Sequence, residues 1–509
     1  MENTKALGKI ARGTGIVFVG TVVAMLLTFF SRAMLARHFD RYHYGSFTLT
    51  VTIISIATTI ALLGLSSGLP RQISHYLRED PPKVSRIIST GLAIALSSSI
   101  ITSLLVILMS GSLASLVKDV LLSKNLHIVS FAIPFIVLLL MLVAISRGYG
   151  RVRENFYYRN MLQPLLFFIL VGTGILLNQG FSFVFIAYLL SWALSGVSLL
   201  IESYKQRLLP RRFEIDGKIG LELLIFSLPL MLTGILDYVM GWTDSIMIGY
   251  YYGPDRVGLY NGAAPIARVL PIFLNSMGFI YMPIATGFYT LGDIRGLEKL
   301  YRSTTKWAFV LTLPLFITAF AFPRTTILLV FGNRYVEAST ALRILSLGFT
   351  FHVAMGLNAM TLLAIGRTYD NLIGNLLAAA LNVVLNITLI PLYGIEGAAV
   401  ATALSYIGAN VYRTWKLRKR IGITPFGKPY LKTLFLGGTA VAVAFIIGDS
   451  GSIVDTALSI LVIYTAFMVA FVRAGCVESE DEELMEVIFK RTGLNFKKVL
   501  DLIGAKRRK

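Results

Sequence analysis

This chain of 509 residues is 55% hydrophobic and only 15% charged, whereas a typical soluble domain is about 25% charged. Such a composition excludes a soluble enzyme, a disordered scaffold and a disulfide-rich secreted module. The single cysteine, Cys476, cannot form an intrachain disulfide. The net charge of +20 would suggest a nucleic-acid partner in a soluble protein. In a chain this apolar it indicates membrane topology instead, because Lys and Arg collect on the cytoplasmic side.

Apolar runs long enough to cross a bilayer, about 20 residues each, recur along the whole chain. The first follows a short basic head and is long enough to remain as a span, so we expect no cleaved signal peptide. The sequence predicts an all-α polytopic membrane protein with fourteen transmembrane helices. The expected spans are residues 14–36, 44–68, 87–109, 127–147, 163–178, 182–202, 221–249, 257–283, 307–330, 341–364, 372–392, 397–415, 431–448 and 454–472.

The distribution of Lys and Arg orients these spans. With the N-terminus in the cytoplasm, cytoplasmic segments hold 37 of the 47 Lys and Arg residues, and outer segments hold 8. This asymmetry is the positive-inside pattern of a multi-pass protein of the cell membrane. An even number of spans returns the chain to the starting side, so we expect both termini in the cytoplasm.

The two halves of the chain repeat weakly. A shift of 213 residues superposes Tyr44-Gly45-Ser46-Phe47 on Val257-Gly258-Leu259-Tyr260, and similar shifts superpose further segments. The repeat is six spans, so we expect two parallel lobes related by an axis along the membrane normal, enclosing a central cleft. The predicted boundaries are a first lobe at 1–212, a second lobe at 213–420, two added spans within 421–475 and a cytoplasmic tail at 476–509.

The predicted tail begins acidic and ends basic. Leu484, Val487, Ile488 and Leu494 follow one another at roughly helical spacing. This pattern is typical of an amphipathic helix that lies on anionic lipid, and a solvated tail explains the same composition.

Charged side chains within the spans are the first candidates for a functional site. A charge at the middle of a span costs on the order of 3 kcal/mol on the insertion scale, so such a residue is expected to border a cavity and to have a partner. Asparagines on the same helical faces extend the set, although hydrogen bonds between helices would explain them as well. The candidate cavity residues are Arg32, Asp237, Asp244, Arg268, Asn275, His352, Asn382 and Asn386.

Three segments resemble a known family. They read D-S-I-M-I-G-Y-Y-Y-G-P-D-R-V-G-L-Y-N-G-A-A at 244–264, F-G-N-R-Y-V-E-A-S-T-A-L-R-I-L at 331–345 and N-V-V-L-N-I-T-L-I-P-L-Y-G-I-E-G-A-A-V-A-T-A-L-S at 382–405. Together with the repeat, they are similar to the Wzx-like oligosaccharide flippases of the multidrug/oligosaccharidyl-lipid/polysaccharide exporter superfamily. The first lobe departs from that pattern at Arg37-His38-Phe39-Asp40, where such proteins usually have Arg-x-Leu-Gly.

The resemblance implies a transporter and not an enzyme. The expected activity is to move a polyprenyl-diphosphate-linked oligosaccharide from the cytoplasmic to the outer leaflet by alternating access of two lobes. The implied partners are this lipid-linked substrate and membrane lipid, with Na⁺ or H⁺ as a candidate coupling ion and glycan-assembly enzymes as candidate neighbours. No cofactor or metal is implied. The alternatives are a cation- or drug-extruding exporter of the same superfamily and a lipid II-type flippase. An intramembrane glycosyltransferase is disfavoured because the outer loops are short and carry no Asp-x-Asp and no Glu-x-x-His.

Under this interpretation the arginines attract the anionic part of the substrate, since guanidinium binds phosphate through bidentate, charge-assisted hydrogen bonds. We expect Arg32 and Asp244 to approach each other across the lobe interface and to help close the outer side. Asp237 would bind a coupling Na⁺ or proton, or pair with Arg268. Four further arginines fit either positive-inside charge beside an aromatic belt or a cytoplasmic landing patch for the diphosphate: Arg147, Arg151, Arg153 and Arg159.

Overall fold

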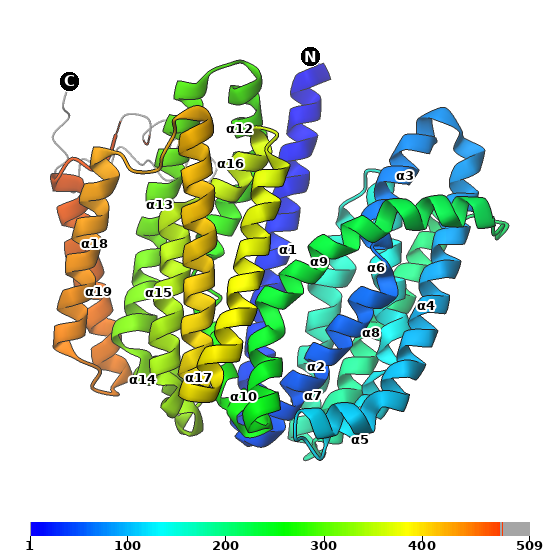
Figure 1. Cartoon of the computed structure of the whole chain (residues 1–509), viewed down its shortest axis with the longest axis horizontal. Helices are drawn as coiled ribbons and strands as arrows, with labels where there is room; N and C mark the ends of the chain where they lie inside the picture. The colour runs from blue at the N-terminus through cyan, green and yellow to red at the C-terminus, as the bar shows by residue number, and fades with distance from the viewer. Residues whose placement is uncertain (1, 479–480, 482–509) are drawn as a thin grey trace. The chain divides into compact units, whose positions relative to one another are not determined.

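The computed structural model describes residues 2–478 and 481, and the side chains of residues 20–478 and 481 except 232–234, 237, 238 and 279. The described residues form helices and connecting turns with no strand (Figure 1), which confirms the predicted all-α class. The amphipathic helix predicted at Leu484 to Leu494 lies outside the described residues.

The helices of the first half are α1 (Glu2–His38), α2 (Arg41–Leu62), α3 (Leu65–Glu79), α4 (Pro81–Leu116), α5 (Leu122–Val129), α6 (Ala132–Gly148), η1 (Asn155–Leu162), α7 (Gln163–Leu176), α8 (Ser182–Lys205), α9 (Gly217–Tyr252) and α10 (Pro254–Asn261). Those of the second half are α11 (Ala264–Ala267), α12 (Ile272–Thr290), α13 (Ile294–Ala321), α14 (Pro323–Val330), η2 (Asn333–Ala338), α15 (Ser339–Met355), α16 (Asn358–Ala364), α17 (Thr368–Ile421), α18 (Lys428–Ile447) and α19 (Ile453–Arg473).

Many of these helices are long and apolar enough to cross a membrane. In the described part of the chain there are ten such helices, or up to twelve if each of two bent pairs is one span. One pair joins Leu122–Val129 to Ala132–Gly148 at 46°, and the other joins Pro254–Ala267 to Ile272–Gly278 at 52°. The protein is therefore a multi-span membrane protein.

Aspartates begin several of the long helices. The carboxylates of Asp40, Asp80, Asp216 and Asp293 accept backbone N–H groups from the first turns of α2, α4, α9 and α13. Each aspartate satisfies a donor that has no partner within its helix, and its charge complements the positive end of the helix dipole. The helix starts are thus fixed by polar residues between apolar runs.

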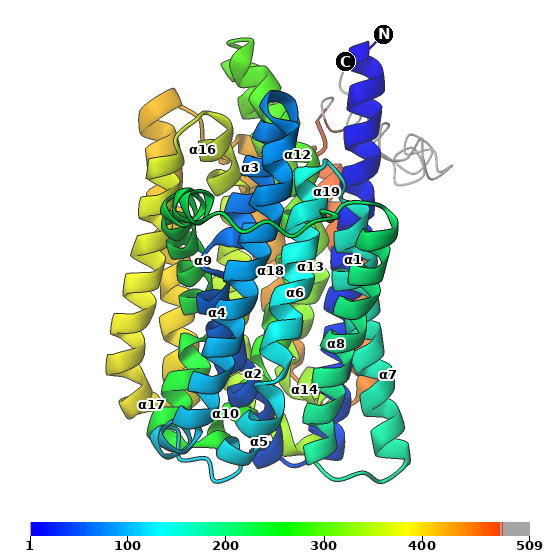
Figure 2. The same ribbon diagram turned by 90° about the vertical axis from the view of Figure 1, so that its right-hand side faces the viewer.

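Contacts divide the chain into two compact units, Met1–Asn261 and Gly262–Lys509. In the first unit, α4, α6 and α8 run alongside one another (Figure 2). The last helices of this unit, α9 and α10, pack on α2, and α9 also contacts α3 and α4. The lobe boundary predicted after residue 212 rests on the sequence repeat and stays a prediction.

The crossing of α2 and α10 joins two segments that the sequence repeat superposes. A Cβ placed on Gly45 would lie 1.8 Å from the carbonyl oxygen of Pro254, and a Cβ placed on Gly258 would lie 2.0 Å from the carbonyl oxygen of Arg41. The contact is reciprocal, because a shift of 213 residues converts Arg41 to Pro254 and Gly45 to Gly258. Such reciprocity is expected at a local two-fold axis, and it supports the repeat.

In the second unit, α13, α15 and α17 run side by side (Figure 1). The 54 residues of α17 would be about 80 Å long if straight, far more than a bilayer of about 30 Å requires. The helix is broken at Gly394, which has φ 58° and ψ −130°. Residues 368–393 and 395–421 are therefore two arms, and side-chain bonds between Asn382 and Thr402 and between Asn375 and Arg413 show that they are antiparallel.

Candidate functional site

The first group of buried polar residues lies where α9 meets α10. Asp244 is 1% exposed, and its Oδ2 accepts a 2.6 Å hydrogen bond from the hydroxyl of Tyr260. Next to it, Asn261 donates from Nδ2 to Oγ of Ser245 at 3.1 Å and to the carbonyl of Val257 at 2.9 Å. The carboxylate of Asp244, a predicted cavity residue, thus accepts a hydrogen bond from Tyr260 of the same unit.

Arg32 lies on α1 and is half-buried. Its Cζ is 5.6 Å from the centre of the Trp242 ring, which is a cation–π contact. Trp242 precedes Asp244 by two residues on α9, so Arg32 reaches the same part of α9 as Asp244. The predicted approach of Arg32 and Asp244 across a lobe interface stays a prediction. Asp237 also belongs to α9, but its side chain, and the coupling site predicted there, lie outside the described side chains.

The predicted landing patch surrounds η1, which is a π-helix, a wide helical form that often marks functional sites. The side chains of Arg147, Arg153 and Arg159 are exposed. Arg151 instead donates from Nε to Oε1 of the buried Glu154 at 2.8 Å. Three of the four arginines are therefore exposed, and Arg151 forms an ion pair.

The second group of polar residues surrounds Asn410 on the second arm of α17. Its Oδ1 lies 3.1 Å from Nδ1 of His352 on α15 and accepts from Nδ2 of Asn358, at the start of α16, at 3.0 Å. Asn358 also donates to the Asn410 carbonyl and to Oγ1 of Thr414, each at 3.2 Å. Three helices of the second unit thus meet through amide, imidazole and hydroxyl groups.

Arg413 adds a guanidinium one turn after Asn410. Its Nη2 donates to Oδ1 of Asn375 on the other arm of α17, while its buried Nε has no acceptor among the described residues. Gly374 provides the room, because a Cβ there would lie 2.7 Å from Nε of Arg413. An arginine that is 7% exposed and whose Nε is unsatisfied is suited to an anion, since buried charges are normally paired.

The predicted asparagines of α17 lie on its first arm, and one of them bonds to the second arm. Asn386 donates from Nδ2 to Oδ1 of Asn382 at 3.1 Å, and Asn382 donates from Nδ2 to Oγ1 of Thr402 at 3.2 Å. Both asparagines are fully buried. Of the remaining predicted residues, Arg268 follows α11 and is half-buried, and Asn275 is exposed on α12.

Sequence reasoning missed Asn358, Asn410, Thr402 and Arg413. Asn410, Arg413 and Thr414 occur at positions i, i+3 and i+4 of an otherwise apolar run, a spacing that places them on one helical face. That spacing was the available signal. Arg413 was instead counted with the cytoplasmic charges, because it lies near the predicted end of its span.

The arrangement is equipped to bind polar ligands. Amides, hydroxyls and guanidinium groups recognise sugars and phosphates through hydrogen bonds. Among the described residues, no three His, Cys, Asp or Glu side chains are placed to hold a metal ion.

Two family models match this chain. One, described as polysaccharide biosynthesis protein, matches residues 10–286, and one described as MatE matches residues 229–388. An uncharacterized membrane protein of Methanocaldococcus jannaschii is 28% identical over 200 residues, and that match spans only 39% of each chain.

Longer matches come from proteins with named roles. A Haloferax volcanii protein designated a "probable low-salt glycan biosynthesis flippase", Agl15, is 23% identical and covers 81% of this chain and 84% of its own. A Shigella flexneri protein designated a "putative O-antigen transporter" is 22% identical and covers 78% of this chain and 94% of its own.

Solved structures share the fold. The lipid II flippase MurJ in an inward closed conformation aligns with a TM-score of 0.76 at 16% identity, covering 90% of this chain and 99% of MurJ. An inward-facing multidrug transporter of the MATE family aligns with a TM-score of 0.65 at 16% identity, covering 78% of this chain and 94% of its own. The architecture is therefore the one that lipid flippases and drug exporters of this superfamily share.

Proposed function

Because this chain belongs to the polysaccharide biosynthesis protein family, whose model matches more than half of it, we propose that it is a flippase for a lipid-linked oligosaccharide. The substrate would be a polyprenyl-diphosphate-linked glycan, moved from the cytoplasmic to the outer leaflet. The designations of the Haloferax and Shigella relatives support this proposal. The protein would act in the cell membrane, with glycan-assembly enzymes supplying its substrate.

The observation that carries the proposal is the polar group of His352, Asn358, Asn410 and Arg413. Its amides can exchange hydrogen bonds with sugar hydroxyls, and Arg413 brings a positive charge with an unsatisfied Nε. A diphosphate would compensate that charge, and the guanidinium geometry suits phosphate oxygens. Arg32 and Arg268 would attract the same anionic head group from other helices.

The proposed topology has fourteen spans with both termini in the cytoplasm. Twelve come from the apolar helices and the two bent pairs. The antiparallel arms of α17 add one more span, because each arm is long enough to cross alone. The 36 residues of α9 supply the fourteenth. The head group would pass through a polar cleft while the polyprenyl tail stays in lipid.

Transport would proceed by alternating access. The tight crossing of α2 and α10 at Gly45 and Gly258 lies near the predicted outer ends of these helices. Movement of α2 away from α10 would therefore open the cleft to the outer side of the membrane. Arg32 and Asp244 would strengthen that closure, and Asp237 would bind a coupling Na⁺ or proton. These assignments rest on the repeat and on the positions of the residues in the spans.

A lipid II-type flippase is the second candidate, favoured by the likeness to MurJ over 90% of this chain. The two candidates share the diphosphate and differ in the glycan. A drug exporter is less well supported, because a cationic drug prefers an acidic site and Arg413 adds positive charge.

The test is reconstitution of the purified protein in liposomes that contain candidate lipid-linked glycans. An external lectin should bind at once the glycans that already lie in the outer leaflet. It should bind the glycans of the inner leaflet, more slowly, only when the protein is present. Lipid II and a polyprenyl-linked sugar without the diphosphate serve as comparison substrates. Equal lectin binding with and without the protein for every diphosphate-linked glycan would contradict the proposal. Faster transport of lipid II than of any oligosaccharide would select the second candidate.

A further inference from the structure

Lys306 of α13 is a lysine whose ammonium group is enclosed. The residue is 1% exposed and lies at the predicted cytoplasmic border of its span. Positive-inside charge explains why a lysine occurs here, but such lysines normally keep their ammonium in water. A lysine buried to this degree requires partners for each of its three N–H donors.

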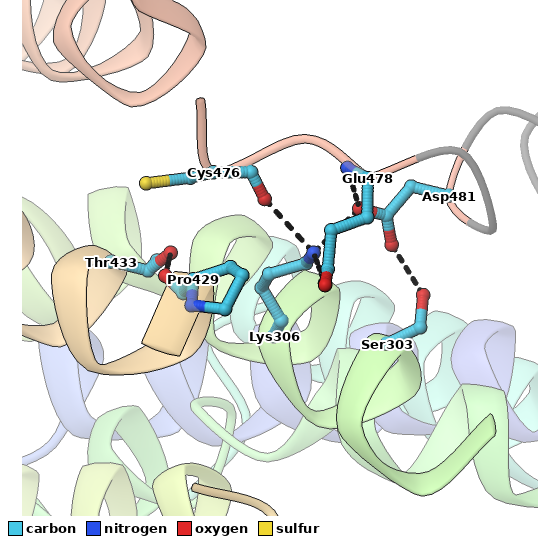
Figure 3. A network of polar contacts seen from close by, with 7 residues as sticks. All are labelled: Ser303, Lys306, Pro429, Thr433, Cys476, Glu478 and Asp481. Atoms are coloured by element: carbon cyan, nitrogen blue, oxygen red, sulfur yellow. Dashed lines mark hydrogen bonds and ion pairs between the residues drawn. The ribbon is translucent and has the colours of Figure 1, made fainter. Parts of the chain in front are cut away.

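The chain after α19 supplies all of these partners. Nζ of Lys306 donates to the carbonyl of Cys476 at 2.9 Å, to Oε2 of Glu478 at 2.7 Å and to Oδ2 of Asp481 at 2.5 Å. Figure 3 shows the acceptors of Cys476, Glu478 and Asp481 converging on the ammonium of Lys306. Each N–H of Lys306 is thereby satisfied.

Asp481 is enclosed to the same degree as its partner. Its side chain is fully buried, its Oδ1 accepts from the hydroxyl of Ser303 at 2.5 Å, and its Oδ2 also accepts from the backbone N–H of Glu478 at 2.8 Å (Figure 3). Ser303 and Lys306 are three residues apart on α13, so they lie on one face of the helix. Together they form a receptor for one carboxylate.

We propose that Ser303 and Lys306 form a carboxylate-binding site on α13, that Cys476, Glu478 and Asp481 of the same chain supply its ligand groups, and that this docking fastens α18 and α19 to α13. The docked segment follows directly from α19, which packs on α18. Its anchoring point on α13 lies beside Trp307, whose ring is 5.7 Å from that of Phe471 on α19. The charged contact thus closes the end of an apolar interface.

The docking also explains why the ligand is acidic. Glu478 and Asp481 begin the acidic stretch that follows α19, and both carboxylates bind one ammonium. Removing one member of a buried ion pair leaves the charge of the other uncompensated. Neither Lys306 nor Asp481 can therefore stay buried as a charged group without its partner. Neutralising either side should therefore undock the segment.

Cys476 makes this proposal testable without an engineered probe. It is the single cysteine of the chain, it is buried, and its own carbonyl accepts from Lys306 (Figure 3). Undocking would bring its thiol into water, so the rate of modification by a small maleimide measures docking directly. The full-length protein in detergent or nanodiscs is the sample.

Lys306→Gln and the double variant Glu478→Gln/Asp481→Asn approach the contact from its two sides. We expect each to increase the labelling rate of Cys476 at least tenfold over the unchanged protein. Lys428→Gln is the matched control, because Lys428 is exposed at the start of α18, and its labelling rate should not change. The tail-side double variant leaves α13 intact, so it gives an answer even if Lys306→Gln does not fold.

A second measurement follows the fastening of α18. Hydrogen exchange at residues 429–436 should become faster in both variants and stay unchanged in Lys428→Gln. Unaltered labelling and exchange in the tail-side variant would overturn the docking site. Faster labelling with unaltered exchange would keep the site and overturn the fastening of α18. Neither readout depends on transport, so both stand apart from the proposed flippase activity.

Discussion

Gly45 of α2 and Gly258 of α10 face each other at a helix crossing that admits no side chain on either. A Cβ on Gly45 would lie 2.8 Å from the backbone nitrogen of Gly258, and a Cβ on Gly258 would lie 3.1 Å from that of Gly45. The atoms in the way are backbone atoms, which cannot rotate aside as a side chain can. The two helices can therefore stay this close only while both positions are glycine.

Gly45→Ala should separate α2 from α10. Overpacking costs about 1–3 kcal/mol, and the overlap with the Pro254 carbonyl is with backbone, so we expect the upper part of that range. The measurement is the thermal unfolding midpoint of the purified protein. Gly111→Ala in α4, where nothing lies within 4 Å of the added Cβ, should leave the midpoint unchanged or slightly raised, since alanine favours helix. Equal midpoints for the two variants would contradict the tight crossing.

Tyr260→Phe removes the hydroxyl that donates to Asp244 and leaves a buried carboxyl with one donor fewer. A lost bond to such a group costs about 1–3 kcal/mol, so the unfolding midpoint should fall. Tyr250→Phe is the control, because Tyr250 is 48% exposed on the same helix as Asp244. If both variants unfold at the temperature of the unchanged protein, the bond does not stabilise the first unit.

Gly394→Ala should strain the turn between the arms of α17. A backbone with φ 58° and ψ −130° is accessible to glycine and costs other residues about 1–3 kcal/mol. We expect reduced yield of folded protein and a lower unfolding midpoint. Gly438→Ala on α18, which also has open space around the added Cβ and lies inside a regular helix, should be tolerated. A Gly394→Ala variant as stable as Gly438→Ala would show that the turn relaxes freely.

Arg413→Gln tests the anion site of the second unit. Under the proposed function, the variant should lose at least tenfold in transport of a diphosphate-linked glycan, because the guanidinium charge and its geometry are gone. Arg413→Lys keeps the charge and should recover part of the rate. Arg418→Gln, an exposed position on the same arm, should transport normally. Normal transport by Arg413→Gln would assign Arg413 to packing alone.

The pH dependence of Cys476 labelling follows from its burial. Burial raises the pKa of the Cys476 thiol above its ordinary value of about 8.5. At neutral pH the reactive thiolate is therefore a smaller fraction of Cys476 than of a free cysteine. The labelling rate should keep rising at pH values above the ordinary thiol pKa. In denaturant the midpoint of the same titration should return to the ordinary value. A folded protein whose midpoint already equals that of the denatured chain would contradict the burial.

The long apolar helices were predictable because hydropathy is a local property of the chain. The two predicted spans at 372–392 and 397–415 correspond to the arms of α17, and Gly394 lies between them. The position of His352 inside a span and the helical spacing of Asn382 and Asn386 also selected these residues, which the structure places in two polar groups of the second unit. Local pattern could not reveal that Asn358 meets Asn410, since that contact joins helices 52 residues apart.

Lys306 shows the limit of counting charges. By sequence it was one of many cytoplasmic basic residues, and the acidic residues after α19 were the start of a tail. Their pairing spans 175 residues and depends on how α19 packs against α13, which no local spacing encodes. Arg151 is a different case, because its bond to Glu154 joins residues only three apart and could have been recognised from local spacing.

The single-residue reversal at Gly394 leaves no slack between the arms of α17. Bonds from Asn382 to Thr402 and from Arg413 to Asn375 tie the arms along their length, so neither can slide along the other. A displacement of one arm would therefore be passed to the other arm through these two contacts. Any movement that a bound ligand imposes on Arg413 would in this way reach Asn382 and Asn386 on the other arm of α17.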